Sequence, residues 1–440
     1  MEPDAVHPWD FRLLAGGQAL SWLGNGFQTV ALAVAVVLNG GGPGELGVVM
    51  AGSVVAMLAG TLFGGVWADR LQPQQVMIAS DVVRCGAAAV LSLLFATGHD
   101  SAVLLTLLSA LSAGAGAFFT PAMRALKPMV TTLDRRQQTN ATLSLLQTTA
   151  SVIGPAAGGV VVAAFGAAAG FAVNSSSFLA SVLTVLFIRA RTERGGRSGL
   201  LREMGEGWTE IRRRDWLLSG VLAATVYHVA NGVVLVLAQV VAIRRLGGAD
   251  AAGYIAAAEG LGGVIGAAVA LRWRPVHLLR VGWCTLLLMP VWVLSYVWPA
   301  TLAAVLAGAA IGYAGLSYFS VAWETAIQDH VPHHVLARVA SWDTLTSFVA
   351  MPVGNALAGP LAQTFGIDRV FVVCAAVLGA TAAAPLFVPG NRHLRARGGS
   401  VDEQVAPLVG TGDEGGLAVA DIRLGADDLG EERVELGQVR

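Results

Sequence analysis

The chain has 440 residues, of which 55% are hydrophobic and 13% are charged, and its mean hydropathy is +0.64. Soluble domains carry roughly 25% charged residues, so most of the surface of this protein is expected to face lipid. The formal net charge of −1 excludes the strongly basic surface with which proteins bind nucleic acid.

The three cysteines lie inside apolar runs, and no two of them form a Cys-x-x-Cys pair. Cys85, Cys284 and Cys374 are therefore expected to be small core thiols, not disulfides or metal ligands. We expect no cofactor. Residues 1–9 lack the basic segment that begins a cleavable signal peptide, so the first apolar run is expected to remain as a helix.

Long apolar runs recur along the chain, separated by short polar segments. A membrane-spanning helix needs about 20 apolar residues at a rise of 1.5 Å each. Outer-membrane strands are excluded, because the runs are too long and do not alternate. We therefore expect an all-α membrane protein with about twelve spans, at residues 11–38, 45–68, 75–97, 101–127, 137–165, 168–189, 216–243, 251–271, 278–297, 301–327, 335–363 and 368–388.

The basic residues gather in alternate loops, which predicts the orientation in the membrane. One set of loops holds only Arg244, Arg245 and Arg369. The other set is expected to face the cytoplasm, together with both termini, because cytoplasmic loops are enriched in Lys and Arg. That second set holds Arg70, Lys127, Arg135, Arg136, Arg189, Arg191, Arg194, Arg197, Arg202, Arg212, Arg213, Arg214, Arg272, Arg274, Arg280 and Arg338.

The longest internal loop divides the spans into two equal groups. We expect residues 1–190 to form one six-helix bundle and residues 216–390 a second. The linker, residues 191–215, is expected to carry an amphipathic helix on the inner membrane surface, with Leu200, Leu201, Met204, Trp208 and Ile211 on its apolar face. Residues 391–440 have no long apolar run and are expected to be a disordered cytoplasmic tail.

The two halves share a faint internal repeat. Residues of the fifth span recur in the eleventh, where Gly154, Ala156, Gly159, Phe165 and Gly166 match Gly354, Ala356, Gly359, Phe365 and Gly366. This correspondence pairs the fifth helix of one half with the fifth helix of the other, which is typical of repeated six-helix halves.

A polar break follows the second span, and its sequence is Gly65-Val66-Trp67-Ala68-Asp69-Arg70. This Gly-x-x-x-Asp-Arg pattern resembles the loop signature of the major facilitator superfamily of transporters. The resemblance implies that Asp69 helps to latch the two halves together on the inner side, against the start of the eleventh span near residues 335–338. In the family the signature continues with basic residues, Gly-Arg-Arg/Lys, but here Gln72-Pro73-Gln74 takes their place. We therefore expect the latch to depend on Arg70 and Arg84. A plain solvated loop is the alternative.

Two charges fall inside the third span. Asp81 and Arg84 are three residues apart and so share one helix face. Charges at this depth are unfavourable unless they are paired or hydrated. We therefore expect them to pair with each other or with the region of Asp69 and Arg124, as a structural or gating cluster and not a substrate site.

The fifth span contains Gly154-Pro155-Ala156-Ala157-Gly158-Gly159. Its glycines allow close approach of helices, and the proline frees a carbonyl group. The run resembles the fifth-helix signature of exporters, although ordinary helix packing would use the same residues. Together with further matches around Glu206-Gly207-Trp208, Gln328, Val331-Pro332, Arg338-Val339 and Gly359-Pro360, it makes residues 10–388 similar to the drug-exporter branch that includes macrolide efflux proteins and enterobactin exporters.

Polar residues inside the first and seventh spans are candidates for a substrate cavity, because the resemblance implies that these two helices line it. On the first span they are Asn25 and Gln28, which are three residues apart. On the seventh they are Tyr227, His228 and Asn231, which share a face. Hydrogen bonding between helices is the alternative role for all five.

Three carboxylates lie inside later spans: Glu259, Glu324 and Asp343. Burial disfavours the charged form of a carboxylate, so such a group can carry a proton across the membrane. Glu324 and Glu259 are the leading candidates for proton coupling, on physical grounds alone.

The chain lacks a Gly-x-x-x-x-Gly-Lys-Ser/Thr phosphate loop, which argues against ATP as the energy source. The chain also shows no Ser/His/Asp arrangement in a soluble domain that would indicate an enzyme. We expect a monomeric, proton-driven exporter of a bulky amphipathic small molecule, such as a drug, antibiotic or siderophore, in the plasma (inner) membrane. The alternatives are an importer or facilitator of a small solute, and a membrane signalling or scaffold protein that does not transport.

Overall fold

The computed structural model describes residues 8–68, 72–99, 101–131, 136–188, 208–273, 275–332 and 349–394, with residues 335, 336, 339, 342, 343, 345 and 346 between the last two ranges. The chain divides into two units, Met1–Arg397 and Gly398–Arg440, and every described residue belongs to the first. Most of the expected tail and most of the expected linker therefore lie outside the described residues.

The first half of the chain forms helices that alternate in direction. They are α1 (Pro8–Leu38), α2 (Pro43–Ala68), α3 (Pro73–Ala96), α4 (Ala102–Leu126), the short 3₁₀ helix η1 (Lys127–Met129), α5 (Arg136–Phe165) and α6 (Ala167–Leu186). Ser101 caps α4 by accepting a hydrogen bond from the Leu104 amide, which satisfies one of the amide groups that a helix start leaves unpaired.

The second half repeats this pattern. Its elements are α8 (Asp215–Arg245), α9 (Ala249–Arg272), α10 (Leu278–Leu286), α11 (Met289–Ser295), α12 (Leu302–His330), α14 (Met351–Phe365), α15 (Ile367–Ala383), the 3₁₀ helix η3 (Ala384–Phe387) and α16 (Pro389–His393). The described part of the chain contains no β-strand. The all-α fold class predicted from the sequence is therefore confirmed.

Eleven helices in the described part of the chain are long and apolar enough to cross a membrane, against about twelve expected spans. The expected span at 335–363 is the one that has no counterpart among these eleven helices. Several of its residues are not described, and α14, which covers its second part, has 15 residues. The protein is thus a multi-pass membrane protein.

The ninth expected span, at 278–297, is broken into α10 and α11. The Leu287 and Leu288 amides donate to Cys284 and Thr285, three residues back, at 3.3 and 3.1 Å. Pro290 follows the break and has no amide hydrogen to continue the α-helical ladder. The expected span is confirmed at Leu278–Ser295, and the structure adds a short break within it.

Two glycines confirm that α5–α6 and α14–α15 are equivalent pairs. Gly166 lies between α5 and α6 with φ of 81°, and Gly366 lies between α14 and α15 with φ of 80°. This left-handed conformation is unfavourable for residues with a Cβ. The repeat seen in the sequence therefore produces the same tight turn in both halves.

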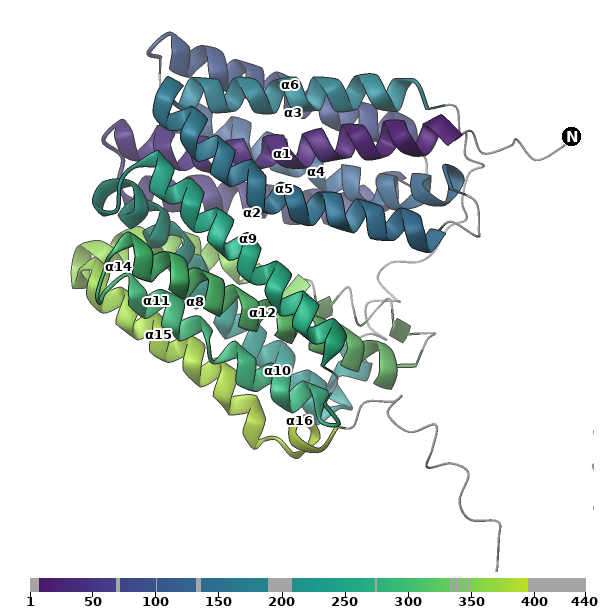
Figure 1. The fold of residues 1–440 in the computed structure, drawn as a ribbon, viewed down its shortest axis with the longest axis vertical. Coiled ribbons are helices and arrows are strands. Elements are labelled where there is room, and N and C mark those ends of the chain that lie inside the picture. The colour runs from purple at the N-terminus through teal and green to yellow at the C-terminus, as the bar shows by residue number, and fades with distance from the viewer. Residues whose placement is uncertain are drawn as a thin grey trace, which may run out of the picture. The chain divides into compact units, whose positions relative to one another are not determined.

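The helices pack as two bundles, α1–α6 and α8–α16, which occupy separate parts of the ribbon in Figure 1. We name the two ends of the bundles by their loops. The linker end is the one at which α6 ends and α8 begins, next to residues 187–214. The far end is the opposite one, at which Leu38, Phe165 and Arg245 end their helices.

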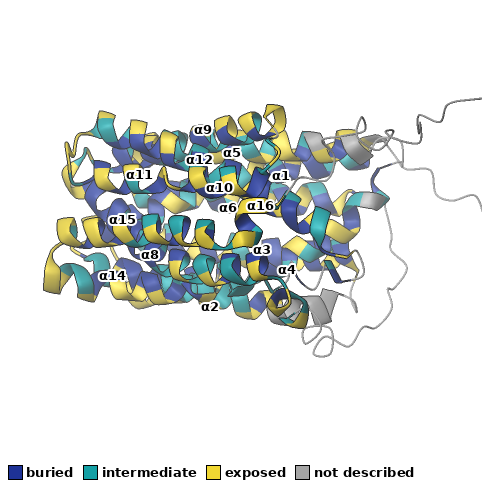
Figure 2. Cartoon of the chain, turned by 90° about the horizontal axis from the view of Figure 1, so that it is seen from below, coloured by how far each residue is buried: buried dark blue, intermediate teal, exposed yellow. Residues whose placement is uncertain are grey.

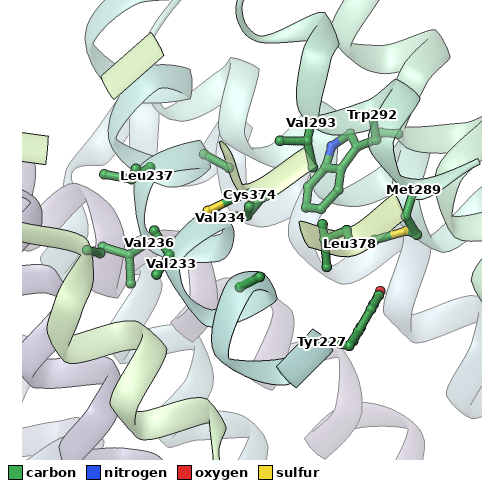
Figure 3. Packing of buried hydrophobic residues seen from close by; sticks show 14 of the residues in the cluster. Tyr227, Val233, Val234, Val236, Leu237, Met289, Trp292, Val293, Cys374 and Leu378 are labelled. Carbon is green, nitrogen blue, oxygen red and sulfur yellow. The ribbon is translucent and has the colours of Figure 1, made fainter. Parts of the chain in front are cut away.

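Buried residues line the helix faces that point toward each other, and exposed residues cover the remaining faces (Figure 2). Leu93, Val103 and Leu107 are examples of large apolar side chains that are more than half exposed, as expected of surfaces that face lipid chains. The largest buried cluster surrounds α8, where Val233, Val234, Val236 and Leu237 pack (Figure 3).

Candidate functional site

The first half contains a buried ion pair at the centre of its bundle. Arg84 Nη1 donates to Asp81 Oδ1 at 3.0 Å, and Asp81 is 1% exposed. Arg84 Nη2 also donates to Asn25 Oδ1 of α1 at 3.1 Å. The guanidinium group lies 3.8 Å from the centre of the Phe178 ring on α6, a cation–π distance. The pair thus ties α3 to α1 and α6.

The two cavity candidates on α1 make contacts within their own bundle. Asn25 accepts the hydrogen bond from Arg84, and Gln28 accepts one from the Asn174 amide of α6. Both side chains remain partly exposed, so they can still face a substrate. Their contacts favour the alternative role, hydrogen bonding between helices.

Three expected gating residues remain. The structure describes Arg124 but not Asp69 or Arg70. Arg124 is exposed near the linker end of α4 and close to Lys127, away from the buried ion pair. Burial, followed by the repulsion from Arg124, lowers the pKa of the Lys127 ammonium group. The latch assigned to Asp69 and Arg70 stays a prediction, because both lie outside the described residues.

The glycine-rich run of α5 packs against helices of both halves. A Cβ placed on Gly158 would lie 2.8 Å from Phe27 Cα of α1, and one on Gly154 would lie 2.9 Å from the Leu23 carbonyl oxygen. On Gly159 it would lie 2.9 Å from Gly253 Cα of α9. The run therefore brings α5 close to α1, and it joins the first half to the second.

A second contact between the halves joins α2 to α14. A Cβ on Gly44 of α2 would lie 3.8 Å from Gly359 Cα of α14. A Cβ on Gly47 would lie closer still to a backbone atom of α14, the Asn355 carbonyl oxygen. We call the α5–α9 and α2–α14 contacts the two seams. These glycine contacts fall in the far-end portions of their helices, so the structure is a state in which the far end is closed.

Arg244 adds a hydrogen bond across the halves at the far end. Its Nη2 donates to the Gly41 carbonyl oxygen, between α1 and α2, at 2.6 Å. The neighbouring Arg245 instead pairs with Asp368 at 2.9 Å, within the second half. These two arginines thus have matched chemistry but different partners.

Arg244→Ala is expected to lower the equilibrium ratio of closed to open molecules at the far end by about fivefold. A hydrogen bond from a charged donor stabilises by about 1.5–3 kcal/mol, and exposure to water reduces this toward about 1 kcal/mol. Distances between spin labels at residues 42 and 365, in a cysteine-free background, would report the open population by electron resonance. Arg245→Ala is the control and should leave it unchanged. An equal effect of both variants would contradict the role of Arg244.

The second half surrounds one carboxylate with tyrosines. Glu259 of α9 accepts a hydrogen bond from the Tyr313 hydroxyl of α12. Tyr296, directly after α11, is close enough for its hydroxyl to interact with the Glu259 charge. Tyr227 of α8 lies in the neighbourhood of Tyr313. We call Glu259 with Tyr227, Tyr296 and Tyr313 the tyrosine–glutamate cluster.

The other proton-coupling candidate, Glu324, has a different environment. It lies on α12 toward the linker end and is exposed. Its charge acts on Asp343, which accepts a hydrogen bond from Trp323 Nε1 at 3.1 Å. Glu324 is therefore not enclosed by the bundle, whereas Glu259 is partly buried within it. The structure thus favours Glu259 of the two.

The three candidates on α8 do not play one common role. His228 Nδ1 lies 2.7 Å from the Ala224 carbonyl oxygen of its own helix. The Tyr227 hydroxyl and Asn231 Oδ1 are buried and have no hydrogen-bond partner among the described residues. Tyr227 and Asn231 therefore retain polar atoms that a ligand could satisfy.

Sequence reasoning missed Tyr296, Tyr313 and the glycine Gly253. A signal for the tyrosines was present, since the chain has only five tyrosines and three of them gather at Glu259. Gly253 carried no signal of its own, because the second half contains many glycines and only packing distinguishes the one that meets α5.

Two repeated helical bundles, two glycine seams and polar clusters within the membrane region define a membrane transporter, not an enzyme. Residues 14–354 match the Major Facilitator Superfamily, and the chain belongs to that superfamily.

Two curated relatives cover most of the chain. The multidrug efflux pump Tap of Mycolicibacterium fortuitum is 26% identical over 392 residues, or 84% of this chain and 93% of that protein. The uncharacterized MFS-type transporter YfiS of Bacillus subtilis strain 168 is 25% identical over 390 residues, or 83% and 89% of the two chains. The resemblance to a drug-exporter type of transporter is thereby confirmed.

Solved structures show the same fold at lower identity. A bacterial homolog of the human lysosomal transporter Spinster, in an inward-facing and unoccupied conformation, has a TM-score of 0.69 and 13% identity, covering 89% of this chain and 98% of that one. The nucleoside transporter NupG has a TM-score of 0.64 and 11% identity, covering 86% and 98%. At these identities the likeness concerns the fold alone.

Proposed function

We propose that this transporter exports a bulky amphipathic small molecule in exchange for protons. Residues 1–190 and 216–390 act as the two moving bundles, residues 191–215 connect them, and residues 391–440 form a cytoplasmic tail. In this proposal the linker end and both termini face the cytoplasm of a plasma (inner) membrane, because basic residues gather in the loops at that end. The protein acts as a monomer.

The observation that carries proton coupling is the environment of Glu259. Its carboxylate lies within the second bundle and forms no ion pair among the described residues. An unpaired carboxylate in such surroundings favours its neutral form, whereas exposure to water on one side of the membrane favours ionisation. Alternation between two such states lets protonation bias the conformation of the transporter.

Export of an amphipathic cargo is supported by two further features. The relatives that match most of the chain include proteins named as multidrug efflux pumps. The glycine-rich run of α5, which resembles the exporter signature, lies at the seam between the halves. Rocking of the bundles about the seams would expose a midplane site to each side in turn.

Glu259→Gln is expected to remove the gradient-driven part of transport. Glutamine keeps the size and the hydrogen-bonding capacity of the side chain but cannot exchange a proton. The measurement is uptake of a fluorescent amphipathic dye into inverted membrane vesicles with an imposed pH gradient. Wild type should accumulate the dye, and Glu259→Gln should fall to the uptake seen without a gradient.

Glu324→Gln is the matched control, because it removes a carboxylate that is exposed on a neighbouring helix. It should retain gradient-driven uptake. Loss of uptake in Glu324→Gln with normal uptake in Glu259→Gln would move the proton site to α12 and overturn the assignment of Glu259.

A further inference from the structure

Asn355 of α14 is a buried polar side chain without a partner. Its exposed fraction is 0%, and neither its amide nitrogen nor its amide oxygen forms a hydrogen bond with any described residue. Asn174 and Asn391 are equally buried, but both are hydrogen-bonded to other side chains. A buried amide without partners is unfavourable, because the hydrogen bonds that it forms with water are not replaced.

Asn355 lies where α14 meets two other helices, α8 of its own half and α2 of the first half. A Cβ on Gly232 of α8 would lie 3.0 Å from Asn355 Oδ1. A Cβ on Gly47 of α2 would overlap the Asn355 carbonyl oxygen. The residue is therefore enclosed by helices of both halves, and α2 supplies one wall of the enclosure through the α2–α14 seam.

The internal repeat shows that close packing at a seam does not require this amide. The offset of 200 residues between the halves places Pro155 of α5 at the position of Asn355. The backbone contact is similar in the α5–α9 seam, where a Cβ on Gly253 would lie 2.7 Å from the Pro155 carbonyl oxygen. The proline side chain has no polar atom to leave unpaired. The unfavourable burial of an amide at this position therefore belongs to the α2–α14 seam.

We propose that Asn355 sets the balance between the two conformations of the transporter by destabilising the one with a closed far end. When the far end opens, α2 separates from α14 and one wall of the enclosure is removed. The amide can then form hydrogen bonds with water, so its unpaired state burdens the closed conformation alone. A transporter leaves each conformation in every cycle, and the unpaired amide offsets part of the stability that two close-packed glycine seams give to the closed one.

This inference goes beyond the proposed function. It requires alternation between two conformations, but it depends on neither the cargo, the direction of transport nor proton coupling. The test therefore measures the two populations directly. Spin labels at residues 42 and 365, in a cysteine-free background and in lipid nanodiscs, report the ratio of closed to open molecules by electron resonance, with no gradient present.

Asn355→Ala removes the amide and introduces no larger group. It is expected to raise the ratio of closed to open molecules by roughly three- to tenfold, because relief of the unpaired amide outweighs the loss of a few packing contacts. A fall in this ratio would show that the amide holds the seam together, and an unchanged ratio would show that it has no effect. Either result would overturn the proposal.

Asn355→Asp is expected to act in the opposite direction. Aspartate has nearly the size of asparagine, but at about pH 8 its ionised carboxylate is still less favourable to bury. The ratio of closed to open molecules should fall by at least about tenfold. Because the two variants shift the populations in opposite directions, one of them gives a measurable change whichever conformation wild type favours. A ratio in Asn355→Asp equal to or above that of wild type would contradict the proposal.

Ser109→Ala is the matched control. The Ser109 hydroxyl of α4 is also buried without a hydrogen-bond partner among the described residues, but α4 packs against α2 and α3 of its own half. Its removal should affect both conformations equally and leave their ratio unchanged. A shift in Ser109→Ala as large as that in Asn355→Ala would overturn the role of the seam. Thermal unfolding identifies the variants that are folded, and Asn355→Ala alone decides if Asn355→Asp does not fold.

Discussion

Asp81→Ala is expected to lower the free energy of unfolding by about 3–5 kcal/mol, because it leaves Arg84 charged and unpaired inside the first bundle. The partner arginine cannot lose its proton readily, and Asp81 is 1% exposed, so water does not replace the lost carboxylate. The contacts of Arg84 with Asn25 and Phe178 retain the guanidinium group in place. Thermal unfolding in detergent, followed by size-exclusion fluorescence, measures the loss.

The double variant Asp81→Leu with Arg84→Met is the test of this reasoning. Replacing a buried ion pair by apolar residues of similar volume is often neutral, so the double variant should recover most of the stability that Asp81→Ala loses. A single variant as stable as wild type would contradict the buried pair as a structural element. Transport by a stable double variant would further show that the pair holds the bundle together and does not contact the substrate.

Gly253→Ala is expected to reduce transport by roughly five- to 150-fold while leaving the protein folded. Its Cβ would lie 2.8 Å from Gly159 Cα and 2.7 Å from the Pro155 carbonyl oxygen. Both are backbone atoms of α5 and cannot rotate away. Overpacking of this kind costs typically about 1–3 kcal/mol, and here the cost falls on the state in which the far end is closed.

Gly263→Ala provides the matched control on the same helix, since a Cβ at Gly263 meets nothing within 4 Å. It should transport as wild type does. Spin-label distances across the far end should increase in Gly253→Ala and stay unchanged in Gly263→Ala. Normal transport by Gly253→Ala would show that the α5–α9 seam is not closed tightly during the cycle.

The sequence was sufficient to predict the fold because the bilayer imposes a length on every span. Gly166 and Gly366 even placed corresponding turns in the two halves. The break between Leu286 and Met289 was missed, because Pro290 lies within a run whose hydropathy is continuous.

The site was predicted less completely, for a geometric reason. The Asp81–Arg84 pair followed from a spacing of three residues on one helix. Glu259 and Glu324 were equally good candidates in the sequence, because hydropathy does not show whether a side chain points into the helix bundle or lies on its surface. The tyrosines around Glu259 come from α8, from α12 and from the residue that follows α11. Their meeting depends on how these helices are rotated, which no local pattern records.

The two seams have an additional consequence for how the two halves are joined. α5 corresponds to α14 through the internal repeat, and α2 and α9 are the second helices of their halves. The α5–α9 and α14–α2 contacts are therefore the same interface formed twice with the partners exchanged. Each half carries both complementary surfaces, so the two halves meet through two equivalent interfaces, as the subunits of a symmetric dimer do.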